Sequence, residues 1–117
     1  MPVKSSSSSV LIWPDAASVT GAIREWAKRL MDARGDVLRV GCFGSYARGD
    51  WGPGSDVDLV MIVSRSTTPF DRRALEFDAT RLPVPVDLIV YTEEEWRELA
   101  RRGGRFARTV ESEGMWV

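Results

Sequence analysis

Three short apolar runs, separated by segments with helical periodicity, limit what this chain can fold into. The runs are rich in β-branched residues, and glycine, proline or charged residues bound them. Runs of this length predict strands, and in 117 residues their order predicts one domain in which helices and strands interleave around a small sheet. The predicted fold class is therefore α+β (mixed α/β). The three runs are "DVLRVGCFG" (36–44), "DVDLVMIV" (56–63) and "VPVDLIVY" (84–91).

Helical periodicity is clearest in "DAASVTGAIREWAKRLMDARGD" (15–36), whose apolar residues form one stripe. The segment "TEEEWRELARRGG" (92–104) begins with Thr92 and Glu95 at the spacing of a capping box, so it also predicts a helix. The segment "PFDRRALEFDATRL" (69–82) predicts a further helix. Residues 105–117 predict a last helical segment followed by a short apolar end.

The composition excludes several classes of function. Sixteen basic and seventeen acidic residues give a net charge of −1, which argues against direct nucleic-acid binding. The chain has no histidine, so catalysis by histidine and histidine metal sites are excluded. The single cysteine, Cys42, cannot form an internal disulfide, and its apolar neighbours favour a buried packing role.

The beginning of the chain predicts an arm rather than a targeting segment. Residues 1–9 contain five consecutive serines and predict a flexible N-terminal arm, so residues 10–117 form the single folded domain. The apolar stretch that follows is too short for a signal peptide, and no run approaches the roughly 20 residues of a membrane span. We therefore expect a cytoplasmic protein that has no contact with a membrane.

The pair Asp56 and Asp58 stands at the start of the second apolar run. Residues two apart in a strand point to the same face, so both carboxylates should project together while Val57 and Leu59 face the core. An aspartate in apolar surroundings is costly unless its charge is offset, and two neighbouring carboxylates repel each other. Mg²⁺ prefers carboxylate oxygens together with substrate phosphates, so the pair predicts a site for a metal and a nucleotide.

The glycine-rich connection before this pair predicts a phosphate-binding loop. Gly44 permits close approach of backbone, Ser45 offers a hydroxyl and an N–H, and a helical turn near Ser45 would point free N–H groups at an anion. Arg48 can add a phosphate contact. Tight turns at Gly49 and at the following glycines would then bring Ser55 back beside Gly44.

A third carboxylate, Asp87, lies within the third apolar run. If that strand pairs beside the second one, Asp56, Asp58 and Asp87 can together hold two Mg²⁺ ions, one at the attacking hydroxyl and one at the triphosphate. Asp87 is the best candidate to accept the proton of the nucleophile. Each feature alone has a plainer explanation, because an Asp-x-Asp pair can cap a strand and Asp87 can protect an edge strand from unwanted pairing.

The stretch "GSYARGDWGPGSDVDL" (44–59) resembles the G-S-x-x-x-G-x(n)-[ST]-D-x-D-L signature of the polymerase-β-type nucleotidyltransferase superfamily. Asp87 matches the third family aspartate, and the short chain resembles the minimal nucleotidyltransferases of bacteria and archaea. The resemblance implies a mixed sheet and transfer of a nucleoside monophosphate from ATP or another NTP to a hydroxyl. The residues that fit the signature are Gly44, Ser45, Gly49, Ser55, Asp56, Asp58 and Leu59.

The resemblance also implies a partner. Larger family members carry extra domains that hold the acceptor, and here few residues remain for one, so another protein or subunit should deliver it. Minimal members are often antitoxins that transfer AMP to a HEPN-domain ribonuclease toxin. This resemblance therefore implies a Mg²⁺-dependent adenylyltransferase acting on a HEPN-type toxin partner.

Two alternatives remain open on the sequence. The chain can be an interaction module, an antitoxin that binds its partner and a nucleotide without turnover. It can also modify a small molecule such as an antibiotic, which would require an acceptor pocket, most simply one built across the interface of a homo-oligomer.

Overall fold

The computed structural model describes residues 15–44, 47, 49 and 56–117. The helices and strands follow the predicted order, with one segment that differs. Residues 1–14, which include the predicted arm, lie outside the described part of the chain. The elements are α2 (Ala16–Ala33), β1 (Val37–Phe43), β2 (Val57–Val63), the 3-10 helix η1 (Phe70–Glu76), β3 (Val86–Thr92), α4 (Glu93–Arg101), α5 (Arg105–Glu113) and β4 (Met115–Trp116).

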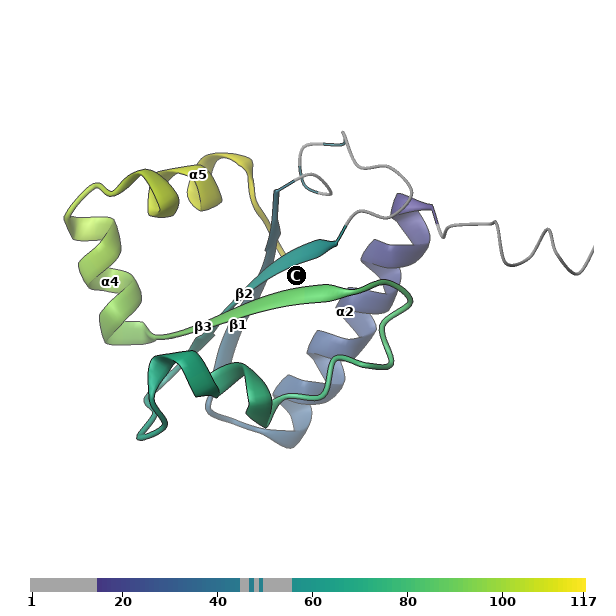
Figure 1. Ribbon diagram of the computed structural model, residues 1–117, viewed down its shortest axis with the longest axis horizontal. Coiled ribbons are helices and arrows are strands. Elements are labelled where there is room, and N and C mark those ends of the chain that lie inside the picture. The colour runs from purple at the N-terminus through teal and green to yellow at the C-terminus, as the bar shows by residue number, and fades with distance from the viewer. Residues whose placement is uncertain (1–14, 45–46, 48, 50–55) are drawn as a thin grey trace, which may run out of the picture.

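The strands form one four-stranded mixed sheet in the order β3-β2-β1-β4 (Figure 1). β2 pairs with β3 in parallel, whereas β1 is antiparallel to both β2 and β4. The short apolar end of the chain thus supplies β4, a two-residue strand at one side of the sheet. β3 is the strand at the other side. The predicted α+β class is confirmed, with three of the four strands coming from the predicted apolar runs.

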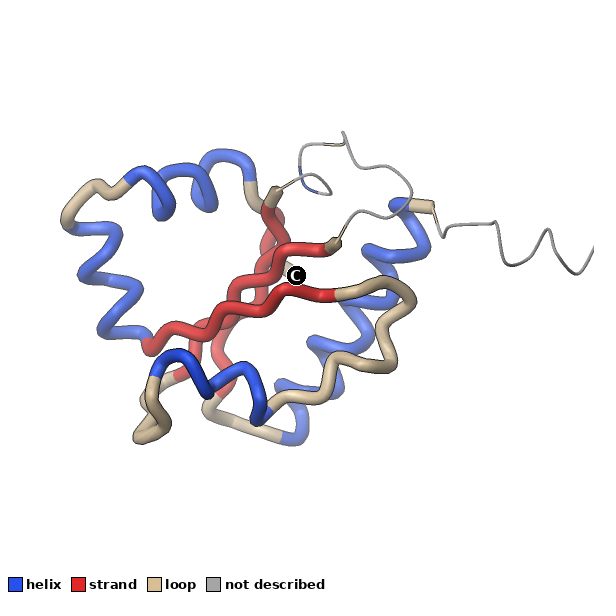
Figure 2. The backbone as a smooth tube through the Cα atoms, in the orientation of Figure 1, coloured by secondary structure: helices blue, strands red, loops and turns tan. Residues whose placement is uncertain are grey.

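Helices cover both faces of the sheet, and Figure 2 shows the twisted strands lying between them. On one face α2 packs its apolar stripe against alternate residues of the strands, and Trp26 belongs to this core. On the other face α4 and α5 pack against Val60 and Ile62. β2 is therefore buried on both sides, and each large side chain it buries contributes roughly 1.5–3 kcal/mol. Residues 59–63 are all at most 2% exposed.

The prediction of a helix over residues 69–82 is wrong in kind and in length. The structure has a 3-10 helix of seven residues, and Phe77 beyond it already has extended backbone. The apolar residues do not form a buried stripe, because Phe70 is 48% exposed and Leu75 is 83% exposed. The buried side chain of η1 is Arg73, so hydrogen bonds rather than an apolar face hold this segment.

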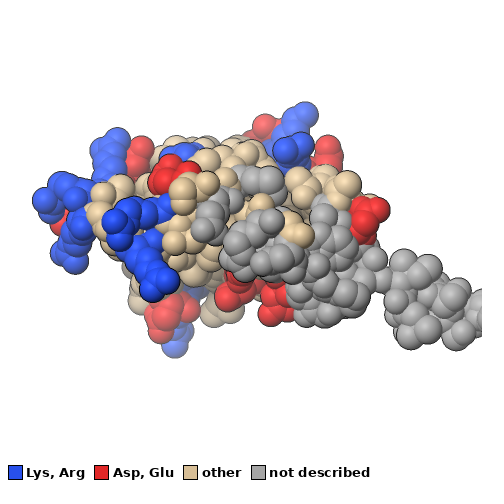
Figure 3. Space-filling view, turned by 90° about the horizontal axis from the view of Figure 1, so that it is seen from above, with Lys and Arg blue, Asp and Glu red and all other residues tan. Residues whose placement is uncertain are grey.

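Charged side chains of both signs cover the end of the molecule formed by α4 and α5 (Figure 3). Five arginines lie between residues 97 and 108, and the same two helices carry six glutamates. Glu98 forms ion pairs with both Arg101 and Arg102, and Glu93 pairs with Arg97. The local positive charge is thus largely offset. No helix of the described residues has the length and apolar character needed to cross a membrane.

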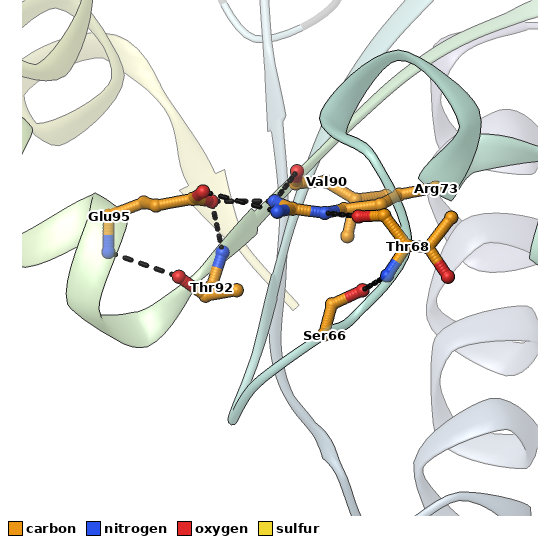
Figure 4. A network of polar contacts seen from close by, with 6 residues as sticks. All are labelled: Ser66, Thr68, Arg73, Val90, Thr92 and Glu95. Carbon is orange, nitrogen blue, oxygen red and sulfur yellow. Dashed lines mark hydrogen bonds and ion pairs between the residues drawn. The ribbon is translucent and has the colours of Figure 1, made fainter.

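Arg73 and Glu95 form the centre of a polar network that joins η1, β3 and α4 (Figure 4). Arg73 is 7% exposed, and its guanidinium binds both carboxylate oxygens of Glu95 at 2.6 and 3.1 Å. It also donates to the carbonyl oxygens of Thr68 at 2.9 Å and Val90 at 3.3 Å. Each of the three guanidinium nitrogens therefore has an acceptor, which offsets the cost of removing the charge from water.

The predicted capping box is part of the same network. The Thr92 hydroxyl accepts a hydrogen bond from the N–H of Glu95 at 3.1 Å, and the Glu95 carboxylate accepts one from the N–H of Thr92 at 2.9 Å. The hydrogen bonds from Arg73, followed by those from Thr92, lower the pKa of Glu95 below its usual value, although partial burial opposes this. The Glu95 carboxylate thus both caps the start of α4 and compensates the buried charge of Arg73.

We predict that Glu95→Gln lowers the free energy of unfolding by about 1 kcal/mol at pH 7. A carboxylate whose pKa is depressed in the folded state stabilises the protein above its unfolded pKa of about 4.3, and this stability is lost as the pH falls through the folded pKa. The difference in the free energy of unfolding between wild type and Glu95→Gln should therefore shrink below about pH 4. Urea unfolding across the pH range measures it, with the exposed Glu94→Gln as control. Parallel pH profiles for wild type and Glu95→Gln would contradict the ion pair.

Candidate active site

The structure brings two of the predicted carboxylates into direct register. Asp58 of β2 lies opposite Asp87 of β3 in the parallel ladder, and Asp56 lies just before β2. Residues that pair across adjacent strands share a face of the sheet, so Asp58 and Asp87 project together. This is the face of Val60 and Ile62, which α4 and α5 cover further along the strands. The predicted placement of the third strand beside the second is thus observed.

The surroundings of these carboxylates are more polar than the apolar runs suggested. Asp58 is half-buried, while Asp56 and Asp87 are exposed. Asp87 is exposed because β3 is an edge strand. Asp58 and Asp87 are thus brought together by the pairing of adjacent strands and not by burial.

Gly44 ends β1 directly beside Asp58. Its φ of +77° lies in the left-handed region that favours glycine. A Cβ built at Gly44 would overlap the Oδ2 atom of Asp58 and lie 3.2 Å from its Cγ atom. Phe43, which pairs with Asp58 across the β1–β2 ladder, borders the same place. Glycine at position 44 therefore lets the end of β1 approach the Asp58 carboxylate.

The structure describes only some of the predicted phosphate-binding residues. Ser45, Arg48 and Ser55 lie outside the described residues, so their predicted roles stay predictions. Gly49 is described and has a φ of +83°, so the tight turn predicted there is present. A Cβ at Gly49 would meet no heavy atom within 4 Å.

Cys42 is a packing residue, as predicted. Its side chain is 3% exposed and belongs to the apolar cluster beneath α2. Burial, followed by the charge of Asp58, raises the pKa of the Cys42 thiol to about 11. The thiol is therefore protonated at neutral pH and is not a nucleophile.

The carboxylate set fits Mg²⁺ by its chemistry. Hard cations take oxygen ligands, and Mg²⁺ uses one or two carboxylates together with phosphate oxygens and water. Asp58 and Asp87 can supply such oxygens from adjacent strands, and Asp56 lies just before β2. Among residues 15–44, 47, 49 and 56–117, no three His, Cys, Asp or Glu side chains are grouped as around a metal ion. A divalent cation offsets the repulsion between such carboxylates, which favours their convergence in the bound state.

A cavity of about 590 Å³ lies away from these carboxylates, beside Val63 at the opposite end of β2. Two of its three arginines are ion-paired, since Arg34 pairs with Asp36 and Glu76 while Arg73 pairs with Glu95. The third, Arg65, is exposed. We interpret it as part of the supporting structure. The buried Arg73 was not found from the sequence, where it lies in an ordinary charged segment.

Comparison with known proteins agrees with this arrangement. A sequence model of the family described as "Nucleotidyltransferase domain" matches residues 23–116 of the chain. The chain belongs to the nucleotidyltransferase domain family. The matched residues include β1, β2 and β3, and therefore every carboxylate of the candidate site.

Individual relatives support the same assignment. Over 69 residues, this nucleotidyltransferase domain is 35% identical to a protein of Methanocaldococcus jannaschii that is named as a proposed protein adenylyltransferase. The alignment covers 58% of this chain and 70% of that protein.

Two solved structures share the fold. A proposed nucleotidyltransferase from Sulfolobus solfataricus superimposes with a TM-score of 0.51 and 23% identity, over 73% of this chain and 81% of the other. The crystal structure of a toxin–antitoxin with AMP-PNP superimposes with a TM-score of 0.50 and 19% identity, over 88% of this chain and 72% of that one. At these identities the likeness shows the fold alone, which is that of nucleotidyltransferases.

We predict that MgATP raises the melting temperature of the wild-type protein by binding its native state, and that Gly44→Ala abolishes this rise. The new Cβ would displace the Asp58 carboxylate and also strain the backbone by about 1–2 kcal/mol. Gly103→Ala is the matched control, because Gly103 has a φ of +66° but no heavy atom within 4 Å of a built Cβ. It should lose similar stability and keep the response to MgATP. A normal MgATP response in Gly44→Ala would refute the role given to this contact.

Proposed function

We propose that this chain is a Mg²⁺-dependent nucleotidyltransferase that transfers AMP from ATP to a hydroxyl of a partner protein. The observation that carries the proposal is the register of Asp58 and Asp87, which puts two carboxylates on one face of the sheet beside Gly44. Family membership supports nucleotidyl transfer as the reaction. The proposed setting is the cytoplasm.

The relatives support the choice of a protein acceptor. One curated relative is named as a proposed protein adenylyltransferase, and one structural neighbour is a toxin–antitoxin with AMP-PNP. We accordingly propose that the chain is the antitoxin of such a pair and that its partner is a HEPN-type toxin. The binding-only antitoxin and the small-molecule transferase are the competing functions, and the experiments below separate them.

In the proposed reaction, the oxygen of the acceptor hydroxyl forms a bond to the α-phosphorus of ATP. The bond from that phosphorus to the oxygen bridging to the β-phosphorus breaks, and pyrophosphate leaves. The hydroxyl proton passes to the carboxylate of Asp87. Mg²⁺, when held by Asp56, Asp58 and Asp87, supplies positive charge for the triphosphate and the attacking oxygen.

The remaining site residues position the nucleotide in this proposal. Gly44 keeps the end of β1 close to Asp58, so that a phosphate group can approach the turn. Ser45, Arg48 and Ser55 are proposed to bind the phosphates through hydroxyl, guanidinium and backbone N–H groups. Gly49 provides the turn between them.

We predict that ATP labelled on its α-phosphate, incubated with Mg²⁺, the protein and a lysate of the source organism, labels a protein acceptor. ATP labelled on its γ-phosphate should add no label beyond that which the kinases of the lysate produce without the protein, because pyrophosphate leaves unlinked. Asp58→Asn should reduce the label at least about 100-fold, since even outer-shell partners of a metal cost 10–100-fold. Asp71→Asn, an exposed carboxylate on η1, is the control and should keep full activity.

Other outcomes would identify the competing functions. Label from the γ-position above that of the lysate alone would indicate kinase chemistry, and the absence of any protein labelled from the α-position above the same background would rule out a protein acceptor. If Asp58→Asn neutralises a toxin partner as well as wild type does, binding alone explains the function.

Substitutions at Asp87 separate catalysis from protection of the sheet edge. If Asp87 accepts the proton, Asp87→Asn and Asp87→Lys should both lower kcat by roughly 100- to 10,000-fold. If Asp87 only prevents unwanted strand pairing, Asp87→Lys keeps a charge at the edge and should stay active and monomeric. Transfer rates and gel filtration of the two variants measure this, and an active Asp87→Lys would remove Asp87 from the proposed mechanism.

A further inference from the structure

β3 is an edge strand, and its pairing with β2 shows which of its backbone groups face outward. The N–H of Val57 donates to the carbonyl of Pro85 at 2.9 Å, and Val57 lies opposite Val86 in the ladder. In a parallel ladder such a residue bonds to the positions before and after its opposite neighbour. Residues 85, 87, 89 and 91 therefore turn their backbone groups toward β2. Residues 86, 88, 90 and 92 turn theirs away from the sheet.

The second half of this outer edge is sealed by side chains. Arg73 donates to the outward carbonyl of Val90 at 3.3 Å, and Glu95 accepts the outward N–H of Thr92 at 2.9 Å (Figure 4). These two contacts agree with the pattern of outward groups derived from the ladder. The buried network of Arg73 and Glu95 therefore blocks strand pairing along this half of β3.

The first half of the edge is open. Within the described part of the chain, no hydrogen bond reaches the outward backbone groups of Val86 or Leu88. These two residues flank Asp87 in the chain. Asp87 is exposed and lies opposite Asp58, on the same face of the sheet. The open backbone groups thus lie on either side of the proposed catalytic carboxylate.

We propose that the protein acceptor binds as an added strand on this open half of β3. An extended segment of the partner pairs with Val86 and Leu88 through backbone hydrogen bonds, and a serine, threonine or tyrosine of that segment lies opposite Asp87. This inference rests on the proposed function and specifies how its substrate is held. Added strands gain affinity from backbone hydrogen bonds and specificity from alternate side chains.

The geometry of a sheet places the acceptor hydroxyl correctly. Paired residues on adjacent strands share a face and have Cβ atoms about 4.5–5.5 Å apart. A hydroxyl side chain opposite Asp87 therefore lies on the face of the carboxylates and within reach of the proton acceptor. A segment shifted by one residue would point its hydroxyl to the opposite face, so the register itself selects the residue that is modified.

The same face of the sheet also predicts which kind of residue the acceptor carries two positions from the hydroxyl. Ile89 lies two residues beyond Asp87 on this face, is half-buried, and belongs to neither apolar cluster of the described residues. The acceptor residue two positions from the hydroxyl should therefore be apolar and cover Ile89. Pairing then ends at Val90, where Arg73 occupies the edge.

The test compares Leu88→Pro with Leu88→Ala, using the acceptor protein that wild type labels from α-labelled ATP. Proline removes the outward N–H and is tolerated at an edge strand whose N–H faces away from the ladder, whereas alanine keeps the N–H and loses the same packing. We expect the acceptor KM of Leu88→Pro to exceed that of Leu88→Ala about 10-fold, as for the loss of one such hydrogen bond. The rise in melting temperature with MgATP should be equal in the two variants.

A second measurement uses the wild-type protein and needs no substitution. With the acceptor and α,β-methylene-ATP, amide hydrogen exchange at Val86 and Leu88 should slow at least about 10-fold, while Val60 in the central strand serves as the unchanged reference. Equal KM values in the two variants, or unchanged exchange with the acceptor bound, would overturn the added strand while leaving the transferase intact. Protection that depends on protein concentration without acceptor would instead assign the edge to a second copy. A wild type that labels no protein overturns the proposed function itself.

Discussion

The parallel pairing of β2 with β3 determines where the carboxylates of this protein meet. Asp58 and Asp87 share a face only because Val57 lies opposite Val86, and a slip of one residue would move one carboxylate to the α2 face. Burial of β2 on both sides resists such a slip, since Leu59 and Val60 are fully buried on opposite faces. The apolar core therefore fixes the geometry of the polar site.

Helices cover the face of Asp58 and Asp87 unevenly, and this leaves room for the candidate site. β3 leads directly into α4 at Thr92, where the capping box begins the helix. α4 and α5 consequently pack over the second half of β2, against Val60 and Ile62. Asp58, in the first half of the same strand, is half-buried beside Phe43, whose ring contacts Phe106 of α5. Asp87, opposite Asp58 on the edge strand β3, is exposed, so the part of this face that can meet a ligand lies toward β3.

The sequence predicted those features that depend on local patterns. Apolar runs predicted the three strands, and Thr92 with Glu95 marked a capping box that the structure confirms. The prediction of a helix over residues 69–82 was wrong because the structure of this segment depends on Arg73, whose partner Glu95 lies 22 positions away in the chain. Contacts of that range leave no local pattern. The close approach of Gly44 to Asp58 likewise required the register of β1 with β2.

Asp87 can protect the edge of the sheet and still serve an acceptor, because the two tasks involve different partners. If two copies of this chain paired antiparallel through their β3 edges about Asp87, symmetry would place the two Asp87 carboxylates opposite each other. Like charges at such positions destabilise a pair of strands. A neutral hydroxyl residue at the same position meets no repulsion and can donate its hydrogen bond to the carboxylate. Asp87 thereby disfavours pairing with a second copy and favours the kind of strand that the proposed reaction needs.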